Sequence, residues 1–182
     1  MEGKFIVMEY KKNCLMEIYT DNRDSFSVGF YLCSLDKYSL FYLLDNQGKS
    51  DGIYLIKNSF IDNVIYDTEY LKKINFYIKY WNMKSFKINF PILSKLENLT
   101  KLEDYLEFIR DENWVSSFKV SNEDYLVTGY IEDIDEFNIG IKTIDIETAK
   151  DFEKVKISLK DILILEVDSI ENRLLDFAHN NY

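Results

Sequence analysis

The residues whose types could do chemistry lie around one polar turn near the start of the chain. Lys11, Lys12 and Asn13 separate two strand-like stretches, Phe5 to Tyr10 and Cys14 to Tyr19, and this pattern predicts a β-hairpin. A lysine, a tyrosine and a carboxylate can together deprotonate a ribose hydroxyl and stabilise the resulting phosphorane. An ordinary solvated turn is the competing interpretation, because exposed turns are usually polar. The candidate catalytic residues are Glu9, Tyr10, Lys11, Lys12 and Glu17.

Other catalytic arrangements lack their parts in this sequence. His179 is the single histidine, and Cys14 and Cys33 are the two cysteines. The sequence has no glycine-rich phosphate loop, no histidine and carboxylate spacing for a metal, and no cysteine cluster. We therefore expect no metal and no other cofactor, and at most a ribonuclease activity that is independent of metal or dependent on a partner.

A basic segment in the middle of the chain is a second candidate site. From Tyr70 to Lys101, seven lysines stand against one acid, Glu97, and aromatic residues are interleaved with them. Ammonium groups neutralise phosphates and aromatic faces stack on bases, so the pattern is typical of single-stranded RNA binding. In the competing interpretation the aromatic residues face the core and the lysines form a solvated surface. The candidate RNA or partner contacts are Lys72, Lys73, Lys79, Lys84 and Lys87, together with Tyr10, Lys11, Lys12 and Asn13.

Composition places these residues on a soluble, well-cored globular protein. The 182 residues carry a formal net charge of -10, and 47% of them are hydrophobic. A single proline and six glycines argue against disordered and collagen-like chains. No apolar run approaches the roughly 20 residues of a membrane-spanning helix, and Met1 to Tyr10 does not have the pattern of a signal peptide. We therefore expect a cytoplasmic protein.

The excess of acidic residues indicates the kind of partner. An acidic surface repels nucleic acid at long range and is attracted to the basic channels of proteins that handle nucleic acid. We therefore expect a basic nucleic-acid-handling complex, or its RNA, as the partner, and neither direct genomic DNA binding nor membrane binding. Abundant Lys, Ile, Asn and Tyr are typical of AT-rich coding, as in a low-GC bacterium or its phage.

An internal repeat organises the chain. TDNRDSFSVGFYL, from Thr20, aligns with VSNEDYLVTGYI, from Val120, at an offset of 100 residues. After one gap, an offset of 99 holds through KNSFIDNVIYD and KISLKDILILE. Apolar residues alternate within each copy, which predicts half-buried strands. Gly29 and Gly129 fall inside these strands, where glycine is typical of a bulge or a sharp bend.

Helical spacing follows each copy of the repeat. Between the copies, Phe86 to Phe90 predicts a strand, and Thr100 with Glu103 predicts a capping box for a helix that ends near Asn113. The residues at helical spacing are Leu71, Ile74, Ile78 and Trp81 after the first copy, and Ile170, Leu174 and Phe177 after the second.

The second copy resembles the first Sm motif, in which a strand glycine is followed by an aspartate, an apolar residue and an asparagine at a loop. The matching residues are Gly129, Asp135, Phe137 and Asn138. The resemblance implies that Asp135 orients the loop and that Asn138 binds RNA bases, and it extends in part to Asp36. Ser39 stands where the first copy would have the asparagine. A borrowed scaffold whose loop residues only form turns is the competing interpretation.

Together these patterns predict an α+β protein. It consists of two small, strongly bent, five-stranded Sm-like barrels in tandem, each followed by a helix, with an N-terminal β-hairpin and a helix before the second barrel. The expected segments are the hairpin in residues 1–20, the first barrel and helix in 14–82, a basic linking strand and helix in 83–113, and the second barrel and C-terminal helix in 114–182. The barrels are expected to pack as a pseudo-dimer within a monomer.

In size, acidity and coding bias the chain is similar to anti-CRISPR proteins of streptococcal and related mobile elements. That resemblance implies an inhibitor of an RNA-guided effector nuclease or of its guide RNA, with the hairpin touching the guide RNA and promoting its cleavage. Two other classes stay open. A toxin-neutralising immunity protein would cover a basic toxin with its acidic face. An Sm-like regulator would bind free single-stranded RNA through Asp135, Asn138 and the lysines.

Overall fold

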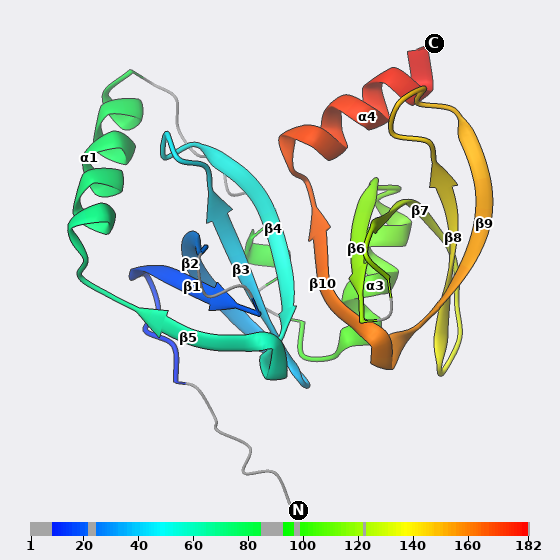
Figure 1. The fold of residues 1–182 in the computed structure, drawn as a ribbon, viewed down its shortest axis with the longest axis horizontal. Coiled ribbons are helices and arrows are strands. Elements are labelled where there is room, and N and C mark those ends of the chain that lie inside the picture. Colours follow the sequence, from blue (N-terminus) through cyan, green and yellow to red (C-terminus); the bar gives the residue numbers. More distant parts are fainter. Residues whose placement is uncertain (1–8, 22–24, 85–92, 97–98, 122, 182) are drawn as a thin grey trace, which may run out of the picture.

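Ten strands form one antiparallel sheet in the computed structural model, which describes residues 9–21, 25–84, 93–96, 99–121 and 123–181. Across the sheet the strand order is β5-β1-β2-β3-β4-β10-β6-β7-β8-β9 (Figure 1). The strands of the first half are β1 (Leu15–Thr20), β2 (Ser27–Leu35), β3 (Tyr38–Leu44), β4 (Ser50–Lys57) and β5 (Ile61–Ile65). Those of the second half are β6 (Ser116–Val120), β7 (Leu126–Ile134), β8 (Asn138–Ile144), β9 (Asp151–Ser158) and β10 (Ile162–Val167).

The predicted pair of five-stranded Sm-like barrels in tandem is therefore wrong. β4 pairs with β10 in an antiparallel register that sets Ile53 opposite Val167 and Ile56 opposite Ile164, so both halves belong to one sheet. Among the described strands, β5 and β9 are the two edges of that sheet. Side-chain alternation locates strands, but every strand edge offers the same backbone N–H and C=O groups. Side-chain patterns therefore do not indicate which strand edges join.

Each half has the same internal strand order, because β5-β1-β2-β3-β4 is matched by β10-β6-β7-β8-β9. Gly29 lies in β2, opposite Leu43 of β3, and Gly129 lies in the matching strand β7, opposite Thr143 of β8. A Cβ atom on Gly29 would overlap the backbone carbonyl oxygen of Tyr42, and one on Gly129 would overlap that of Lys142. Close approach to the neighbouring strand therefore requires glycine at both positions.

Hydrophobic clusters cover both faces of the first half of the sheet. β3 is buried along its whole length, and its neighbours Leu40 and Phe41 point to opposite faces. Leu40 belongs to the larger cluster, which continues across the seam between β4 and β10 to Phe118 and Leu165. Phe41 belongs to the smaller cluster, whose other buried members are Met16, Ile18, Leu43, Ile56 and Ile61, and Ile164 of β10 packs against it. The larger cluster therefore ties the two halves together.

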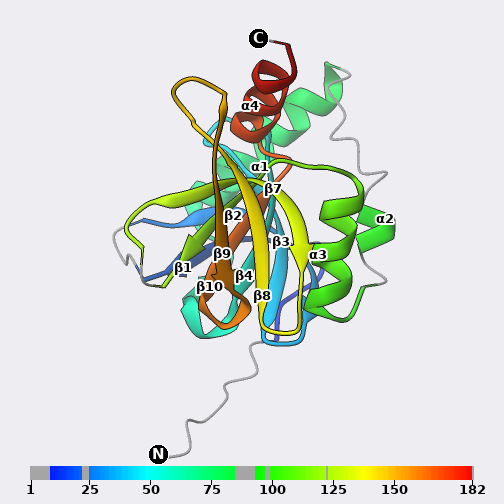
Figure 2. The same cartoon turned by 90° about the vertical axis from the view of Figure 1, so that its right-hand side faces the viewer.

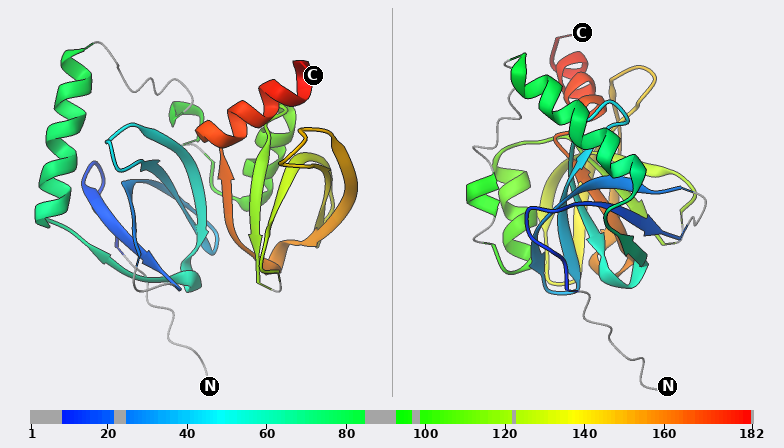
Figure 3. Two further views of the ribbon diagram at one scale, coloured as in Figure 1. Left: turned by 45° about the horizontal axis from the view of Figure 1, so that its top comes forward. Right: turned by 90° about the vertical axis from the view of Figure 1, so that its left-hand side faces the viewer.

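Helices α1 (Glu69–Met83) and α4 (Ile170–Asn181) form at the two places where helical spacing of apolar residues predicted them. α1 follows β5 and α4 follows β10, and α2 (Leu93–Leu96) and α3 (Leu102–Asp111) precede β6. Short 3-10 turns, Asn58–Phe60 and Leu159–Asp161, precede β5 and β10. Figure 3 shows α1 beside the first half and α4 beside the second. Within the described residues, no helix has the length and apolar character needed to cross a membrane.

α3 buries its apolar face but begins differently from the prediction. Tyr105, Leu106 and Ile109 are fully buried against the sheet, and Figure 2 shows α3 with α2 along one side of the molecule. The predicted capping box is not formed, because the N-cap residue is Lys101, which makes no side-chain cap. Instead, the free N–H of Leu102 donates to Asp36 Oδ2 at 3.0 Å. A carboxylate from the β2–β3 turn thus takes the capping role.

The described residues do not form the predicted N-terminal β-hairpin. β1 pairs with β2 over Leu15 to Ile18 on one side and with β5 over Glu17 to Thr20 on the other. Residues 9–11 are not in a strand, and Lys12 and Asn13 form a turn. Phe5 to Met8, and the strand predicted from Phe86 to Phe90, lie outside the described residues.

Candidate functional site: a basic and aromatic helix face

The first turn of α1 is fixed by a buried carboxylate. Thr68 is the N-cap residue, and its Oγ1 accepts a hydrogen bond from the N–H of Leu71 at 3.1 Å. The same hydroxyl donates to Glu17 Oε1 at 2.5 Å, and Tyr19 donates to Glu17 Oε2 at 2.9 Å. Glu17 is only 3% exposed. Its carboxylate therefore connects β1 to the start of the helix.

The last turns of α1 are fixed by the turn between β3 and β4. Trp81 Nε1 donates to the carbonyl oxygen of Gln47 at 2.8 Å. Gly48 has a φ of +75°, and a Cβ atom on it would lie 3.0 Å from Tyr77 Cβ, so a left-handed glycine lets the turn approach the helix. Leu71 and Ile74 are buried between these two anchors. The orientation of the helix, and of its outer face, is therefore set at both ends.

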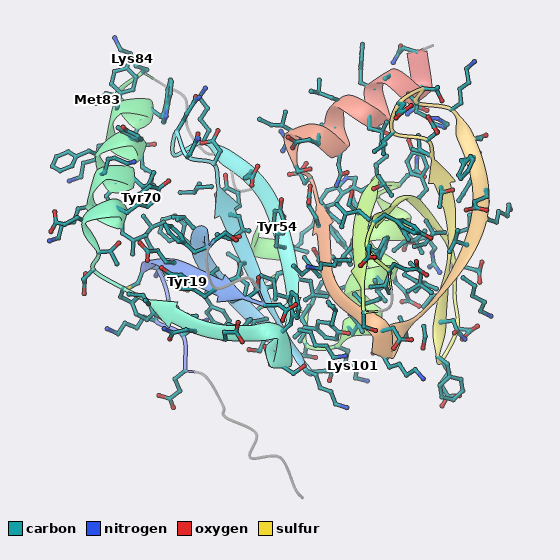
Figure 4. The ribbon with its side chains drawn as sticks, in the orientation of Figure 1. Tyr19, Tyr54, Tyr70, Met83, Lys84 and Lys101 are labelled. Atoms are coloured by element: carbon teal, nitrogen blue, oxygen red, sulfur yellow. The ribbon has the colours of Figure 1, made fainter. Side chains whose placement is uncertain are left out.

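The outer face of α1 is aromatic and solvent-exposed. Phe76 is 67% exposed, Met83 is 77% exposed, and Tyr77 and Tyr80 are also exposed. Figure 4 shows Tyr70 near the first turn of the helix and Met83 and Lys84 at its last turn. The competing interpretation, in which the aromatic residues face the core, is therefore wrong for these three rings. These three residues are also not among those whose helical spacing predicted α1.

Lysine ammonium groups lie beside the exposed rings of α1. Lys73 Nζ is 5.8 Å from the ring centroid of Tyr77, and Lys79 Nζ is 5.1 Å from that of Phe76. Lys84 Nζ is 5.9 Å from the ring of Tyr80. Exposed cation–π pairs of this kind contribute about 0.5–1 kcal/mol each. Positive charge is thus held next to faces on which a base can stack. We call this surface the α1 face: Lys73, Phe76, Tyr77, Lys79, Tyr80, Met83 and Lys84.

Lys72 differs from the other predicted lysines because an acid neutralises it. Its Nζ lies 2.6 Å from Glu69 Oε1, and the hydrogen bond with Glu69 raises the pKa of Lys72. Its charge is therefore less available to a phosphate than that of Lys73 or Lys79. Lys87 lies outside the described residues.

The structure brings the polar turn of the N-terminal segment next to α1. Lys11 and Asn13 line a cavity of about 260 Å³ together with Lys72. The backbone N–H of Lys11 donates to the hydroxyl of Tyr66 at 3.2 Å, and Lys11 Nζ is 4.8 Å from the ring centroid of Tyr66. Two sets of predicted contacts, far apart in the sequence, thus meet at one end of the helix. Tyr66 was not among the predicted residues, and no pattern in the sequence marked it.

The candidate catalytic residues do not converge on one point. The ring of Tyr10 stacks on Tyr31 with centroids 4.8 Å apart and meets Phe41 edge-on at 5.3 Å. This packing places Tyr10 in the cluster that contains Met16. Glu17 follows Met16 in β1, so its side chain points to the opposite face of the sheet. Burial also raises the pKa of the Tyr10 hydroxyl. Glu9 and Lys12 are exposed, and cleavage of RNA by this segment stays a prediction.

The loop residues singled out by the Sm resemblance are engaged with one another. Asp135 Oδ1 accepts hydrogen bonds from the N–H groups of Phe137 and Asn138 and from Asn138 Nδ2, at 2.9, 2.8 and 3.1 Å. Asp135 Oδ2 lies 2.8 Å from Lys156 Nζ. Lys156 and these N–H donors lower the pKa of Asp135. This aspartate orients its own turn, while Asp36, in the matching turn of the first half, caps α3.

A groove of about 820 Å³ lies between these two turns, but its charges offset one another. The described residues that line it include Lys37, Lys57, Lys101 and Lys160, and also Asp36, Glu103, Asp104 and Glu136. Figure 4 shows Lys101 at this end of the molecule, away from α1. Because phosphate binding needs a local excess of positive charge, the α1 face is the better candidate for a nucleic-acid interface.

Metal chemistry has no candidate cluster in the described part of the chain. No group of three or more His, Cys, Asp or Glu side chains is arranged there to hold an ion. His179 Nδ1 lies 2.8 Å from the carbonyl oxygen of Ala149, and its Nε2 lies 3.5 Å from Asp151 Oδ1. This histidine therefore has structural partners that tie α4 to the β8–β9 turn.

Comparisons with known proteins give no family for this chain. A scan against protein-family models, a search of curated proteins and a search of solved structures each found no match. No related protein therefore supplies an activity or a set of site residues, and function is inferred from the chain's own geometry and charge.

Proposed function

We propose that this chain is an interaction protein that binds single-stranded RNA along the α1 face and inhibits an RNA-guided effector nuclease by holding its guide RNA. The observation that carries the proposal is the exposure of Phe76, Tyr77 and Tyr80 with lysine ammonium groups beside their rings. Aromatic side chains in the open are costly to hydrate, and a basic and aromatic surface is the kind on which unpaired bases stack.

Spacing along α1 supports base stacking. Phe76 and Tyr80 are four residues apart, so they lie on the same side of the helix about 5–6 Å apart at Cβ. Each stacked base contributes about 1–3 kcal/mol, independently of sequence. Lys73, Lys79 and Lys84 can reach the phosphates between such bases.

The charge of the whole molecule supports an RNA that is already bound to a basic protein. A net charge of -10 repels free nucleic acid beyond the α1 face. In a complex of a guide RNA with a basic nuclease, the RNA meets the α1 face while the nuclease meets the acidic remainder, and both contacts are favourable. We therefore expect tighter binding to the complex than to free RNA.

The test compares charge-matched variants in an RNA-binding assay. Fluorescence polarisation of a labelled oligouridine is measured against salt for the wild type, for Lys73→Gln/Lys79→Gln/Lys84→Gln, and for the control Lys142→Gln/Lys154→Gln/Lys156→Gln. Each phosphate neutralised on a single strand contributes about 0.7 to the slope of log K against log salt. The α1 variant should therefore lower the slope by about two, and the control should leave it unchanged.

Aromatic variants separate stacking from charge. Phe76→Ala/Tyr80→Ala should weaken RNA binding by at least about tenfold, because two stacking faces are lost. The matched control is Phe152→Ala, since Phe152 is an equally exposed ring on β9. Equal RNA affinity of the wild type and both α1 variants would refute the α1 face as the RNA site.

The other two functional classes give different results with the same proteins. An inhibitor of the nuclease suppresses target cleavage by a purified type II effector complex, and the α1 variants should lose that suppression. A regulator of free RNA binds the oligouridine as tightly as the complex and leaves cleavage intact. An immunity protein binds its toxin tightly in a one-to-one complex without any RNA.

A further inference from the structure

A second groove, of about 1110 Å³, lies beneath α4 in the other half of the molecule. The residues lining it come from α4, from β4, β10, β6 and β7, and from the turn between β8 and β9. It reaches the seam where β4 meets β10, at Tyr54. Figure 4 shows Tyr54 at that seam, apart from Tyr70 and Met83 on α1. We call it the α4 groove.

One side of the α4 groove is apolar and open to solvent. Leu174 of α4 is 64% exposed, and Ile146 in the β8–β9 turn is 73% exposed. Tyr125 and Leu126, at the start of β7, are exposed as well. Ile170 and Phe177 continue the apolar stripe of α4 beyond Leu174 and are also exposed. The helical spacing that predicted α4 therefore marks a face that the described residues leave uncovered.

Polar residues hold α4 in this orientation. Asn172 is buried, on the side of α4 that faces the sheet, and its Oδ1 accepts a hydrogen bond from Ser117 Oγ at 2.9 Å. Ser117 Oγ also shares a hydrogen bond with Thr128 Oγ1 at 2.9 Å, and the N–H of Asn172 donates to Ser169 Oγ at 3.2 Å. Turning the apolar stripe inward would leave these buried groups without partners, which is costly. The exposed stripe is thus a fixed feature.

The other side of the α4 groove is acidic. Asp51 and Glu166 are half-buried, and Glu171 lies close to them on α4. Burial raises the pKa of Glu166, and the negative charges of Asp51 and Glu171 raise it further, against the hydrogen bonds from Ser169 and Tyr54. Burial and the charge of Glu171 likewise raise the pKa of Asp51. Of the described residues that line the groove, Lys150 is the one basic side chain.

We propose that the α4 groove binds a basic amphipathic segment of a protein partner. An arginine or lysine of the segment lies between Asp51 and Glu166, and its apolar side chains pack on Leu174, Ile146 and Leu126. A cation there relieves the repulsion among the carboxylates and gains charge-assisted hydrogen bonds. Apolar side chains of the segment remove the exposed stripe from water.

Charge argues against the other occupants of the groove. RNA would bring phosphates to Asp51, Glu166 and Glu171. A second copy of this chain would bring a molecule that also carries a net charge of -10, and like charges at an interface are unfavourable. The inference goes beyond the proposed RNA binding and does not depend on it, because it uses other residues on the other half of the molecule.

The test uses two synthetic peptides of the same length and helical pattern. One has leucines on one face and lysines on the other, and its counterpart has glutamates in place of the lysines. Fluorescence anisotropy measures the binding of each peptide to the full chain. The proteins are the wild type, Asp51→Asn/Glu166→Gln, Leu174→Ser, and the control Asp104→Asn/Glu136→Gln, which removes two negative charges at the other end of the sheet.

We expect the lysine peptide to bind the wild type and the control equally, and the glutamate peptide not to bind. Asp51→Asn/Glu166→Gln and Leu174→Ser should each weaken binding by about tenfold or more. Equal binding of the lysine peptide to all four proteins would overturn the proposal, and so would a wild-type dimer in light scattering that Leu174→Ser dissociates. The α1 variants should bind the lysine peptide normally, so failure of the RNA assay leaves this test intact.

Discussion

Glu17 and Glu166 are both withdrawn from solvent and both accept hydrogen bonds, but only Glu166 has other carboxylates beside it. The two oxygens of Glu17 accept hydrogen bonds from Thr68 and Tyr19. Glu166 instead shares its site with two further carboxylates, and its pKa is raised by burial and by their charge. Glu17 therefore serves the fold, whereas Glu166 is kept at a cost to stability, as is common at binding sites.

Neutralising Glu166 should stabilise the protein at high pH. Because the pKa of Glu166 is raised in the folded state, the folded state holds the proton more tightly than the unfolded state, and this contribution to stability is lost as pH rises through the folded pKa. Glu166→Gln cannot ionise, so the variant does not lose this stability as pH rises. The midpoint of thermal unfolding should therefore rise relative to wild type at about pH 8, and less so at about pH 4, where the wild-type carboxyl is largely protonated. Circular dichroism measures both. A larger gain at the lower pH would contradict this account.

At the scale of elements, the sequence predicts existence better than orientation. The spacing of Leu71 and Ile74, and of Ile170 and Leu174, correctly indicated α1 and α4. It did not show that Ile170 and Leu174 face solvent, because a stripe on a helix does not say on which side the sheet lies. The orientation of α4 is set by Asn172, which is hydrogen-bonded to Ser117 of β6 and to Ser169, the residue before α4. Ser117 is distant in sequence, and a pattern of apolar residues does not indicate the hydrogen bond with Ser169.

For the candidate site residues too, the sequence indicated which residues matter better than how they are arranged. Lysines and aromatic residues near α1 were recognisable from composition, because basic and aromatic residues are interleaved there. That Lys11 lines a cavity with Lys72 depends on the pairing of β1 with β5, which no local pattern specifies. Tyr10 and Glu17 both belong to the predicted catalytic set but lie on opposite faces of the sheet, because Tyr10 packs with Met16 and neighbouring residues of a strand alternate in direction.

The cap of α3 by Asp36 can be measured directly. Asp36→Ala should lower the free energy of unfolding by about 1 kcal/mol, because the Leu102 N–H loses its acceptor and the helix N-terminus loses a nearby negative charge. Asp36→Asn keeps an acceptor without the charge and should cost less. Urea denaturation followed by circular dichroism gives both values. If Asp36→Ala were as stable as wild type, the capping role would be disproved.

For the whole molecule, the seam between β4 and β10 predicts one cooperative unit. The two halves share backbone pairing at the seam and a hydrophobic cluster that continues across it. Neither half therefore loses its partner without exposing core residues. Thermal unfolding should give a single transition in calorimetry, with a calorimetric enthalpy equal to the van't Hoff enthalpy. Two separate transitions would show that the halves fold as independent domains.

Joining the halves through β4 and β10 has a consequence for assembly. By the shared strand order, the remaining edges are unlike: β9 corresponds to β4, and β5 corresponds to β10. The same join, repeated between molecules, would add chains head to tail into a closed ring or an open fibre. On β9, Asp151, Lys154 and Lys156 carry charges that are already paired with neighbours on the sheet, and charged edge strands resist such growth. The strand order would thus permit repeated edge-to-edge association, and the charged side chains of β9 oppose it.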